Sequence, residues 1–184
     1  KRKTNYALAP SVIKKNFIKE LTTGIEPPPA YFPKNVWMNK GVNSSIDEVI
    51  SRGITPLKLA AFKALAEDPE YLVLDVRSPQ EYTAGSIPGS WFIGLDGQFA
   101  PWVGSLIENI DQKIVLITPE GREKETVTRL ARVGYDNAQG YLIGGFSAWK
   151  TSGFEISSIE NVTAQGFIDG LEDGSIKNPI DTRR

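Results

Sequence analysis

The residue types that most often carry out catalysis are partly missing from this chain of 184 residues. It contains no cysteine and no histidine, which excludes thiolate nucleophiles, disulfides, iron–sulfur clusters, imidazole bases and His-ligated metals. What remains is the loop TPEGRE, residues 118–123, which follows the apolar run 114–117. The Thr118 hydroxyl could in principle act as a nucleophile, and the Arg122 guanidinium could bind an anion.

A second set of polar residues, Asp75, Arg77 and Glu81, follows the apolar run 71–74. Carboxylates and a guanidinium at this spacing can form charge-assisted hydrogen bonds, which are short and strong. We therefore expect the set to fix the turn that follows a buried strand. Such a role is structural and by itself implies no activity.

The elements that must hold these groups alternate between strand and helix patterns. Buried parallel strands are expected at 71–74, 114–117 and 138–143. Helices are expected from Thr55-Pro56 through Leu65, at 123–133, and after Gly144-Gly145 as far as Trp149. This alternation indicates an α/β fold with a parallel sheet of about five strands and helices on both faces.

The first part of the chain reads differently from the rest. A helix is predicted that ends at Gly24, and the Pro-rich stretch 27–33, PPPAYFP, is expected to run extended. Tyr31 and Phe32 within it either dock on a neighbouring surface or belong to a plain linker. Because the chain begins with Lys1 rather than Met, we expect it to be part of a longer protein.

The end of the chain resembles an earlier part of it. Ile54-Thr55 leads through a helical pattern to Asp75-Val76-Arg77, and Val162-Thr163 leads likewise to Asp181-Thr182-Arg183. This similarity indicates either a chance match or the start of a second copy of the same unit.

Three stretches resemble the rhodanese family of sulfurtransferase domains. They are DVRSPQEY at 75–82, GSIPGS at 85–90 and YLIGGFSAW at 141–149. The first is similar to the family signature D-x-R-x-x-x-E-[YF], and the last is similar to G-G-x-x-A-W. The resemblance implies a rhodanese-like three-layer fold, in which the signature residues have structural roles: Asp75, Arg77, Glu81, Gly144, Gly145 and Trp149.

In an active member of that family, a cysteine at the end of a central strand opens a loop of the form C-x-x-G-x-[RK], whose backbone N–H groups hold an anion or a persulfide. The corresponding loop here is Thr118-Pro119-Glu120-Gly121-Arg122-Glu123. Thr118 cannot form a persulfide, and Pro119 lacks an N–H donor. Glu120 and Glu123 place negative charge where an anionic substrate would bind. The resemblance therefore implies an inactive domain, a pseudoenzyme without a catalytic residue, a cofactor or a metal of its own.

Two alternatives stay open for this loop. It could retain a sulfurtransferase or phosphatase-like activity that uses Thr118. It could instead belong to a binding module in which Arg122 docks an anion or an acidic peptide.

The N-terminal flank resembles a further group of proteins. Residues 3–6, 29–33 and 38–41 resemble the C-terminal tail of the metallo-β-lactamase-like domain in metallo-hydrolase–rhodanese fusions, which are similar to persulfide dioxygenases. The resemblance implies that residues 1–45 are this tail with a Pro-rich linker and that residues 46–154 are the inactive rhodanese-like domain. Residues 155–184 would begin a second, truncated rhodanese-like repeat. The parent protein would be a metallo-hydrolase/sulfurtransferase of sulfur metabolism, with iron or zinc in its hydrolase domain.

Composition limits the range of partners. Lys and Arg number 21 against 22 Asp and Glu, and there is no long basic block, so we expect no nucleic-acid or anionic-membrane surface. No apolar run approaches the roughly 20 residues that cross a bilayer. We expect a cytoplasmic domain with a scaffolding or interface role. Its partners would be the adjoining hydrolase and second rhodanese domains, and oligomer formation is left open.

Overall fold

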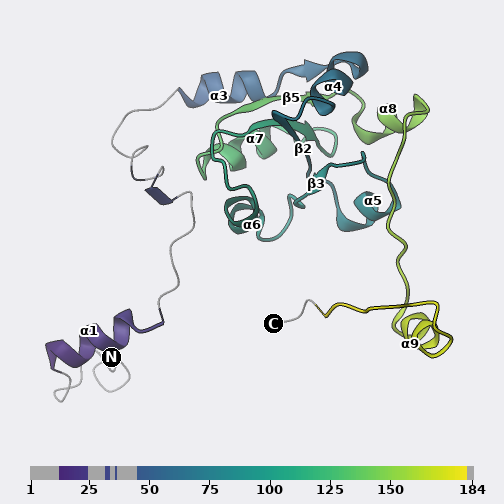
Figure 1. The fold of residues 1–184 in the computed structure, drawn as a ribbon. Coiled ribbons are helices and arrows are strands. Elements are labelled where there is room, and N and C mark those ends of the chain that lie inside the picture. The colour runs from purple at the N-terminus through teal and green to yellow at the C-terminus, as the bar shows by residue number, and fades with distance from the viewer. Residues whose placement is uncertain (1–12, 25–31, 34–35, 37–44, 182–184) are drawn as a thin grey trace.

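The computed structural model of the chain describes residues 13–24, 32–33, 36 and 45–181. Its central part is a three-layer α/β body (Figure 1). The strands are β1 (Pro56–Leu57), β2 (Tyr71–Asp75), β3 (Trp91–Phe92), β4 (Lys113–Ile117) and β5 (Ala138–Leu142). The helices are α1 (Lys14–Thr22), α3 (Ile46–Gly53), α4 (Leu59–Ala66), α5 (Pro79–Ala84), α6 (Phe99–Leu106), α7 (Glu123–Ala131), α8 (Gly145–Thr151) and α9 (Ala164–Glu172).

The five strands form one sheet in the order β1-β5-β4-β2-β3, and every neighbouring pair is parallel. The α/β fold predicted from the sequence, with about five parallel strands, is therefore confirmed. In the centre of the sheet, Asp75 of β2 lies beside Ile117 of β4. The Val76 N–H donates to the Ile117 carbonyl at 2.9 Å. The segments that follow β2 and β4 consequently leave the sheet side by side.

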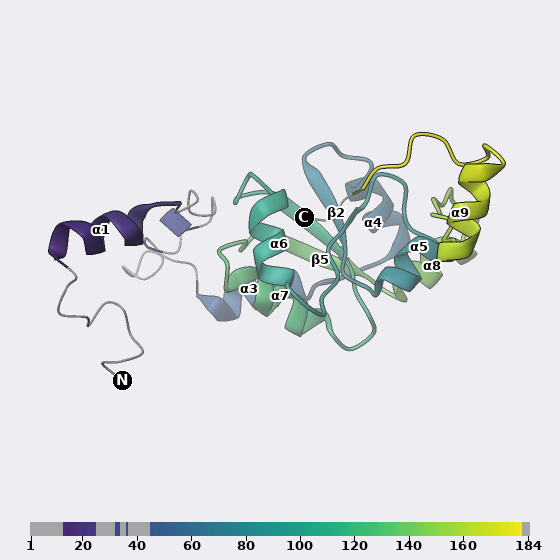
Figure 2. The ribbon, with the colours of Figure 1, turned by 90° about the horizontal axis from the view of Figure 1, so that it is seen from below.

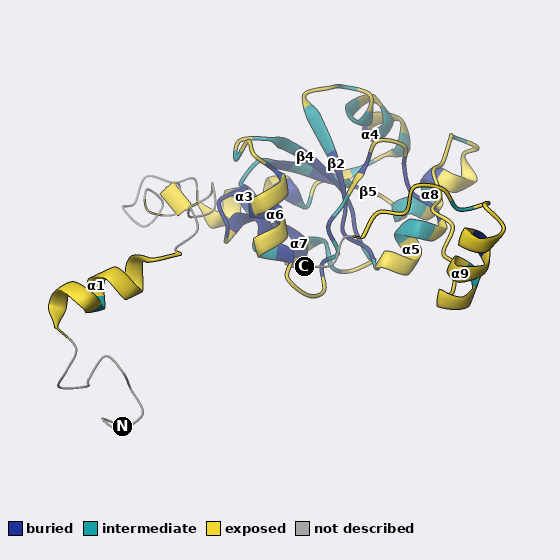
Figure 3. Ribbon diagram, turned by 60° about the horizontal axis from the view of Figure 1, so that its bottom comes forward, coloured by how far each residue is buried: buried dark blue, intermediate teal, exposed yellow. Residues whose placement is uncertain are grey.

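Two apolar cores lie on opposite faces of the sheet. On one face, α3, α6 and α7 contribute Val49, Phe99, Val103, Val127 and Leu130, which pack on Leu74, Ile114 and Leu116. On the other face, Phe62 of α4 and Trp149 of α8 pack on Val73, Val115, Ile117 and Leu142. Figure 2 shows the two groups of helices on either side of the sheet, and Figure 3 shows the buried strands between their exposed outer surfaces. Because β2 and β4 are covered on both faces, residues 71–74 and 114–117 within them form apolar runs.

The prediction that a helix begins at Thr55-Pro56 is wrong. Pro56 and Leu57 form the edge strand β1, and the helix begins at Leu59. The Thr55 and Leu57 carbonyls accept from the Tyr141 and Ile143 N–H groups, each at 3.0 Å. Pro56 fits this edge because the β1–β5 pairing uses carbonyls of β1 as acceptors, and the missing proline N–H is not needed.

The flanking segments carry little of the core. α1 has no buried residue and lies apart from the body in Figure 1; it ends before Gly24, whose φ of +76° suits a helix C-terminus. The side chain of Phe32 is 48% exposed, so the chain itself does not bury it as the docking prediction required. Tyr31 lies outside the described residues. None of the helices that the structure describes is long and apolar enough to cross a membrane.

The segment that leaves the body stays attached to it before α9 begins. Ser157 pairs with Ser86 in an antiparallel bridge, and the Ile159 N–H donates to the Thr83 carbonyl at 2.8 Å. The side chain of Thr163 then caps α9 by accepting from the Gly166 N–H at 3.0 Å. Ile180 and Asp181, which correspond to the end of the first strand in the proposed repeat, are exposed and not in a strand.

Candidate functional site

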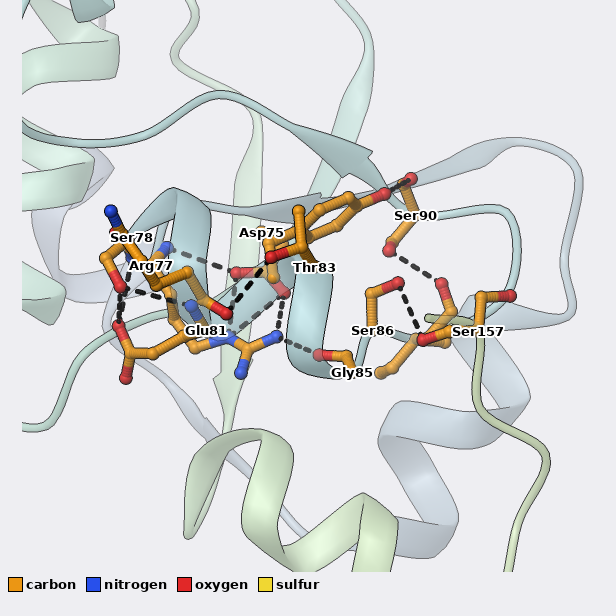
Figure 4. Close-up of polar contacts among 12 residues, drawn as sticks. Asp75, Arg77, Ser78, Glu81, Thr83, Gly85, Ser86, Ser90 and Ser157 are labelled. Carbon is orange, nitrogen blue, oxygen red and sulfur yellow. Dashed lines mark hydrogen bonds and ion pairs between the residues drawn. The ribbon is translucent and has the colours of Figure 1, made fainter. Parts of the chain in front are cut away.

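Asp75 and Arg77 form a buried ion pair where β2 ends (Figure 4). Arg77 Nε lies 3.0 and 3.1 Å from the two carboxylate oxygens of Asp75, and Nη2 lies 2.6 Å from Oδ2. Nη2 also donates to the Gly85 carbonyl at 2.8 Å, beyond the end of α5. The guanidinium thus joins the end of the strand to the far end of the following helix and fixes the turn between them.

The protein almost completely buries this pair. Asp75 has no exposed surface and Arg77 is 8% exposed. Burial raises the pKa of Asp75, while the hydrogen bonds and charge of Arg77 oppose that rise. The Arg77 guanidinium also lies over the Phe146 ring, with 4.4 Å from Cζ to the ring centroid. Phe146, in α8, therefore ties the first family signature to the last.

Glu81 does not bond to Arg77 and instead stabilises the start of α5. Its carboxylate accepts from the Ser78 N–H at 3.0 Å and from the Ser78 hydroxyl at 2.6 Å, while the Glu81 N–H donates back to Ser78. This is a capping box. The hydrogen bonds from Ser78 lower the pKa of Glu81.

The G-G-x-x-A-W stretch builds the opposite wall of the site. Gly144 and Gly145 have φ values of +73° and +55°, a left-handed conformation that glycine adopts without strain. They turn the chain from β5 into α8. Trp149 in α8 packs edge-on against Phe62 and Phe154, and its Nε1 donates to the Glu155 carbonyl at 2.9 Å.

The loop after β4 carries the residues that the sequence aligned with the sulfurtransferase loop. Gly121 has a φ of +78°, and the Arg122 N–H donates back to the Pro119 carbonyl at 3.1 Å. The Gly121 N–H donates to the carboxylate of Glu123 at 3.1 Å. One of the backbone donors that would hold a substrate anion is thus taken by a carboxylate of the protein itself.

Thr118 lies at the base of this loop and is only 6% exposed. Its hydroxyl makes no hydrogen bond with any residue that the structure describes. The hydroxyl oxygen is not fully enclosed either, because every fully enclosed polar side-chain atom of the described residues has a hydrogen-bond partner. The hydroxyl therefore keeps contact with the open space above it. No side chain among the described residues is hydrogen-bonded to this hydroxyl as an activating base would be.

Arg122 belongs to a surface cluster beside the loop. Its guanidinium donates to Glu125 at 2.8 and 3.0 Å and to Asp96 at 2.9 and 3.1 Å. The bonds to Glu125 and Asp96 raise the pKa of Arg122, and Arg122 lowers the pKa of both carboxyls. Because four of the five N–H donors of the guanidinium face carboxylates, Arg122 is poorly placed to capture a further anion.

Thr118, the loop and the double glycine surround one pocket of about 430 Å³. Glu81, Glu120 and Glu123 line it, and Arg77 is the cation among its lining residues. Arg122 is not part of the lining. Phe146 and Tyr141 supply aromatic surface. The structure therefore brings together Thr118, Pro119, Glu120 and Glu123 of the predicted loop and places the Arg122 side chain elsewhere.

Two contacts in this region were not predicted from the sequence. Asp96, which holds Arg122, lies in a loop 26 residues earlier with no recognisable pattern around it. Phe146, which covers Arg77, lies within the G-G-x-x-A-W stretch, but the motif itself does not indicate the contact. Both contacts join segments that are distant in the sequence, so only the fold reveals them.

These features define a three-layer α/β domain whose candidate site lies where the central parallel strands end. The family model for the rhodanese-like domain matches residues 58–152. This is more than half of the chain, and the chain belongs to the rhodanese-like domain family. No match was found among curated proteins.

Solved structures show the same fold. A crystal structure of a metallo-beta-lactamase from Staphylococcus aureus subsp. aureus COL is 25% identical, with a TM-score of 0.58, over 77% of this chain and 38% of that chain. The Alr3790 protein from Anabaena sp. is 19% identical, with a TM-score of 0.50, over 64% of this chain and 99% of that chain. A variant of EanB in complex with hercynine is 22% identical, with a TM-score of 0.50, over 72% of this chain and 35% of that chain.

The similarities to the Alr3790 protein and to EanB concern the fold alone. This chain spans well under half of the length of the Staphylococcus aureus protein and of EanB. Among the residues that the structure describes, no group of three or more metal-ligating side chains is placed to hold a metal ion.

Proposed function

We propose that this chain is a non-catalytic rhodanese-like domain with a scaffolding or interface role in a larger protein of sulfur metabolism. The observation that carries the proposal is the state of the loop after β4. Thr118 stands where the family's nucleophilic cysteine stands, and the chain contains no cysteine at all. A hydroxyl cannot carry the persulfide on which sulfur transfer depends.

The loop is also unsuited to an anionic substrate. The Glu123 carboxylate occupies the Gly121 N–H, and Pro119 offers no N–H at all. Glu120 adds a further negative charge to the lining of the pocket. A thiolate or a thiosulfate ion placed there would meet carboxylates instead of converging donors, which is unfavourable.

The contacts of the loop give little support to the two alternatives raised by the sequence. A Thr118-dependent enzyme would need a base to remove the hydroxyl proton, and none of the described side chains is hydrogen-bonded to that hydroxyl. An anion-binding module would need the Arg122 guanidinium, which is held by Asp96 and Glu125 on the outside of the pocket.

The context within a fusion protein forms part of the same proposal. The similarity to a chain described as a metallo-beta-lactamase, of which this chain covers 38%, supports a parent with a metallo-hydrolase domain. The iron or zinc would belong to that domain, and residues 1–45 would be its tail and linker. The adjoining domains would be the partners of this one, in the cytoplasm.

Helix α9 supports a second repeat after residue 154. Like α4, it follows a hydrophobic–threonine pair, Val162-Thr163. Its side chains Phe167, Ile168 and Leu171 are 37–47% exposed. An apolar helix face of this kind is expected of a first helix that covers the sheet of a further rhodanese-like domain.

An assay of sulfur transfer from thiosulfate to cyanide tests the proposal. The unmodified chain is expected to show no transfer above buffer. Thr118→Cys alone should give a weak rate, because Pro119, Glu120 and Glu123 still disfavour a thiolate. Adding Glu120→Gln and Glu123→Gln should raise that rate by more than Thr118→Cys does by itself.

Glu160→Gln added to Thr118→Cys is the matched control, since it removes one exposed carboxylate outside the pocket. Robust transfer by the unmodified chain would refute the absence of catalysis. Full activity of Thr118→Cys alone would show that the surrounding residues do not silence the site.

A further inference from the structure

The charges around the pocket over Thr118 are the reverse of what sulfur anions require. Three carboxylates line it, those of Glu81, Glu120 and Glu123, against the single guanidinium of Arg77. The positive charge of Arg77 is matched by the buried Asp75. The pocket therefore presents a net negative field to whatever enters it.

Two features that would favour anion binding in this pocket are each counteracted by carboxylates of the protein. The N-terminus of α7 points its partial positive charge at the loop, but Glu123 and Glu125 stand in its first turn. The cation of the loop, Arg122, is held outside the pocket by Asp96 and Glu125. Neither the helix terminus nor Arg122 therefore neutralises the lining carboxylates.

A second and independent observation points to a ligand. The Thr118 hydroxyl lies at the pocket, on a side chain only 6% exposed, and has no partner among the described residues. The hydroxyl is not fully enclosed, so its hydrogen-bonding capacity faces the open space of the pocket. Its oxygen can accept a hydrogen bond from a donor that enters the pocket.

We propose that this pocket binds a small organic ammonium ion. The ammonium N–H groups would donate to the Thr118 hydroxyl and to the carboxylates of Glu120 and Glu123. The alkyl part would lie along Phe146 and Tyr141, which also line the pocket. A volume of about 430 Å³ is within the range of small-molecule sites.

This inference deepens the proposed function, since it gives the pocket of a non-catalytic domain a ligand of the opposite charge to the family's substrates. The proposed absence of catalysis and the proposed binding of an ammonium ion can fail separately. A sulfur-transfer assay tests the absence of catalysis, whereas a binding titration tests the charge preference of the pocket. Even if the unmodified chain transferred sulfur, the titration would still test the charge preference of the pocket.

The experiment is an NMR titration of the complete 184-residue chain, labelled with ¹⁵N. Butylammonium chloride is the probe, 1-butanol is its neutral match and sodium thiosulfate is the anion. Butylammonium should shift the amide signals of Gly121, Gly144 and Gly145 saturably, and 1-butanol should not. Thiosulfate should leave these signals unchanged at the same concentrations.

Variants assign the binding to the pocket. Glu120→Gln and Glu123→Gln together should weaken butylammonium binding about 10-fold, because they remove two carboxylate charges from the pocket lining, one on the exposed Glu120 and one on the half-buried Glu123. Glutamine at position 123 can still accept from the Gly121 N–H, so the loop keeps its shape. Thr118→Val should weaken binding about 5-fold, the loss of one hydrogen bond. Glu160→Gln, an exposed carboxylate outside the pocket, should leave the Kd within about 1.5-fold.

Several results would overturn the proposal. They are thiosulfate shifting the same amides at lower concentration than butylammonium, 1-butanol matching butylammonium, no saturable shift from butylammonium, or an unchanged Kd in the Glu120→Gln/Glu123→Gln variant. If that variant loses its dispersed NMR spectrum and is therefore unfolded, Thr118→Val and a salt series on the unmodified chain test the proposal instead. Affinity that does not fall when NaCl rises from about 50 to 500 mM would contradict an electrostatic site.

Discussion

Replacement of Arg77 by methionine should destabilise the domain severely. The Arg77 side chain supplies three of the contacts that compensate the Asp75 carboxylate, at 2.6, 3.0 and 3.1 Å. Asp75 has no exposed surface, and the replacement would leave it only the hydrogen bond from the backbone N–H of residue 77, which is 3.1 Å long in the unmodified chain. Breaking a buried ion pair in this way costs about 3–5 kcal/mol. A domain of this size has about 5–15 kcal/mol of stability in total.

Urea unfolding followed by circular dichroism measures this loss. With a slope of about 2 kcal/mol per molar urea, the midpoint should fall by about 2 M. Arg122→Met is the matched control, because it also removes a guanidinium that is paired with carboxylates, here Asp96 and Glu125, but at the surface. Its midpoint should move far less, since exposed ion pairs contribute little.

The double variant Asp75→Asn/Arg77→Met tests the mechanism. Replacing the carboxylate by a neutral amide removes the uncompensated charge, so the double variant should recover about 1–3 kcal/mol relative to Arg77→Met. The lost bond to the Gly85 carbonyl and the lost contact with Phe146 are common to both variants and cancel in this comparison. Equal stability of the two variants, or a loss below about 1 kcal/mol in Arg77→Met, would refute the reasoning.

The same pair predicts a pH dependence. Burial already raises the pKa of Asp75 above its unfolded value of 3.8, and Arg77 opposes the rise. Without Arg77 the folded-state pKa rises further. A carboxyl with a raised folded-state pKa favours the folded state at low pH, and this advantage is lost as pH increases through that pKa. The deficit of Arg77→Met relative to the unmodified chain should therefore shrink when urea unfolding is repeated at pH 5 instead of pH 7.

Three further predictions concern the supports of the site. Gly140→Ala should cost about 3 kcal/mol or more in urea unfolding, because φ is +140° and a Cβ there would collide with the Thr55 carbonyl oxygen, just before the edge strand. Gly97→Ala, with φ of +92° and open space around the glycine, should cost about 1–2 kcal/mol, and equal losses would contradict the steric argument. Trp149→Phe should lower stability by about 1–3 kcal/mol, because the acceptor of its 2.9 Å hydrogen bond is left without the indole N–H; an unchanged thermal midpoint would count against it. Glu81→Gln should reduce Tm at pH 7, because the Ser78 hydrogen bonds lower the folded-state pKa of Glu81 and its charge then stabilises the fold. This difference in Tm is complete above the unfolded pKa of 4.5 and should disappear as pH falls through the lower folded-state pKa; a pH-independent difference in Tm would show that the charge is not involved.

The fold could be predicted from the sequence because its determinants are local. Apolar runs at 71–74 and 114–117 have no polar residue on either face, and such runs are stable only in a sheet covered on both sides. Asp75 and Arg77 are two residues apart, and their pairing follows from that spacing and burial. Gly144-Gly145 permits the left-handed backbone that the tight turn from β5 into α8 uses.

Local patterns failed where a tertiary partner decided the outcome. Thr55-Pro56 has the features of a helix start, but its carbonyls are acceptors for β5, so it became an edge strand. The stability of that pairing depends on residues 141–143, which no window around Pro56 includes. Similarly, Phe32 in the Pro-rich stretch is exposed, although its residue type favours burial.

At the candidate site, the amino-acid sequence by itself determined that the nucleophile is absent and that Thr118 opens a loop with two added carboxylates. Only the tertiary structure decided which charges face the pocket. Arg122 and Glu123 are adjacent in the chain, yet Arg122 turns outward to Asp96 while Glu123 turns onto the Gly121 N–H. The physical reason is that a charged side chain takes the direction in which its hydrogen bonds are satisfied. For Arg122 the deciding carboxylate comes from a loop that only folding brings within 3 Å.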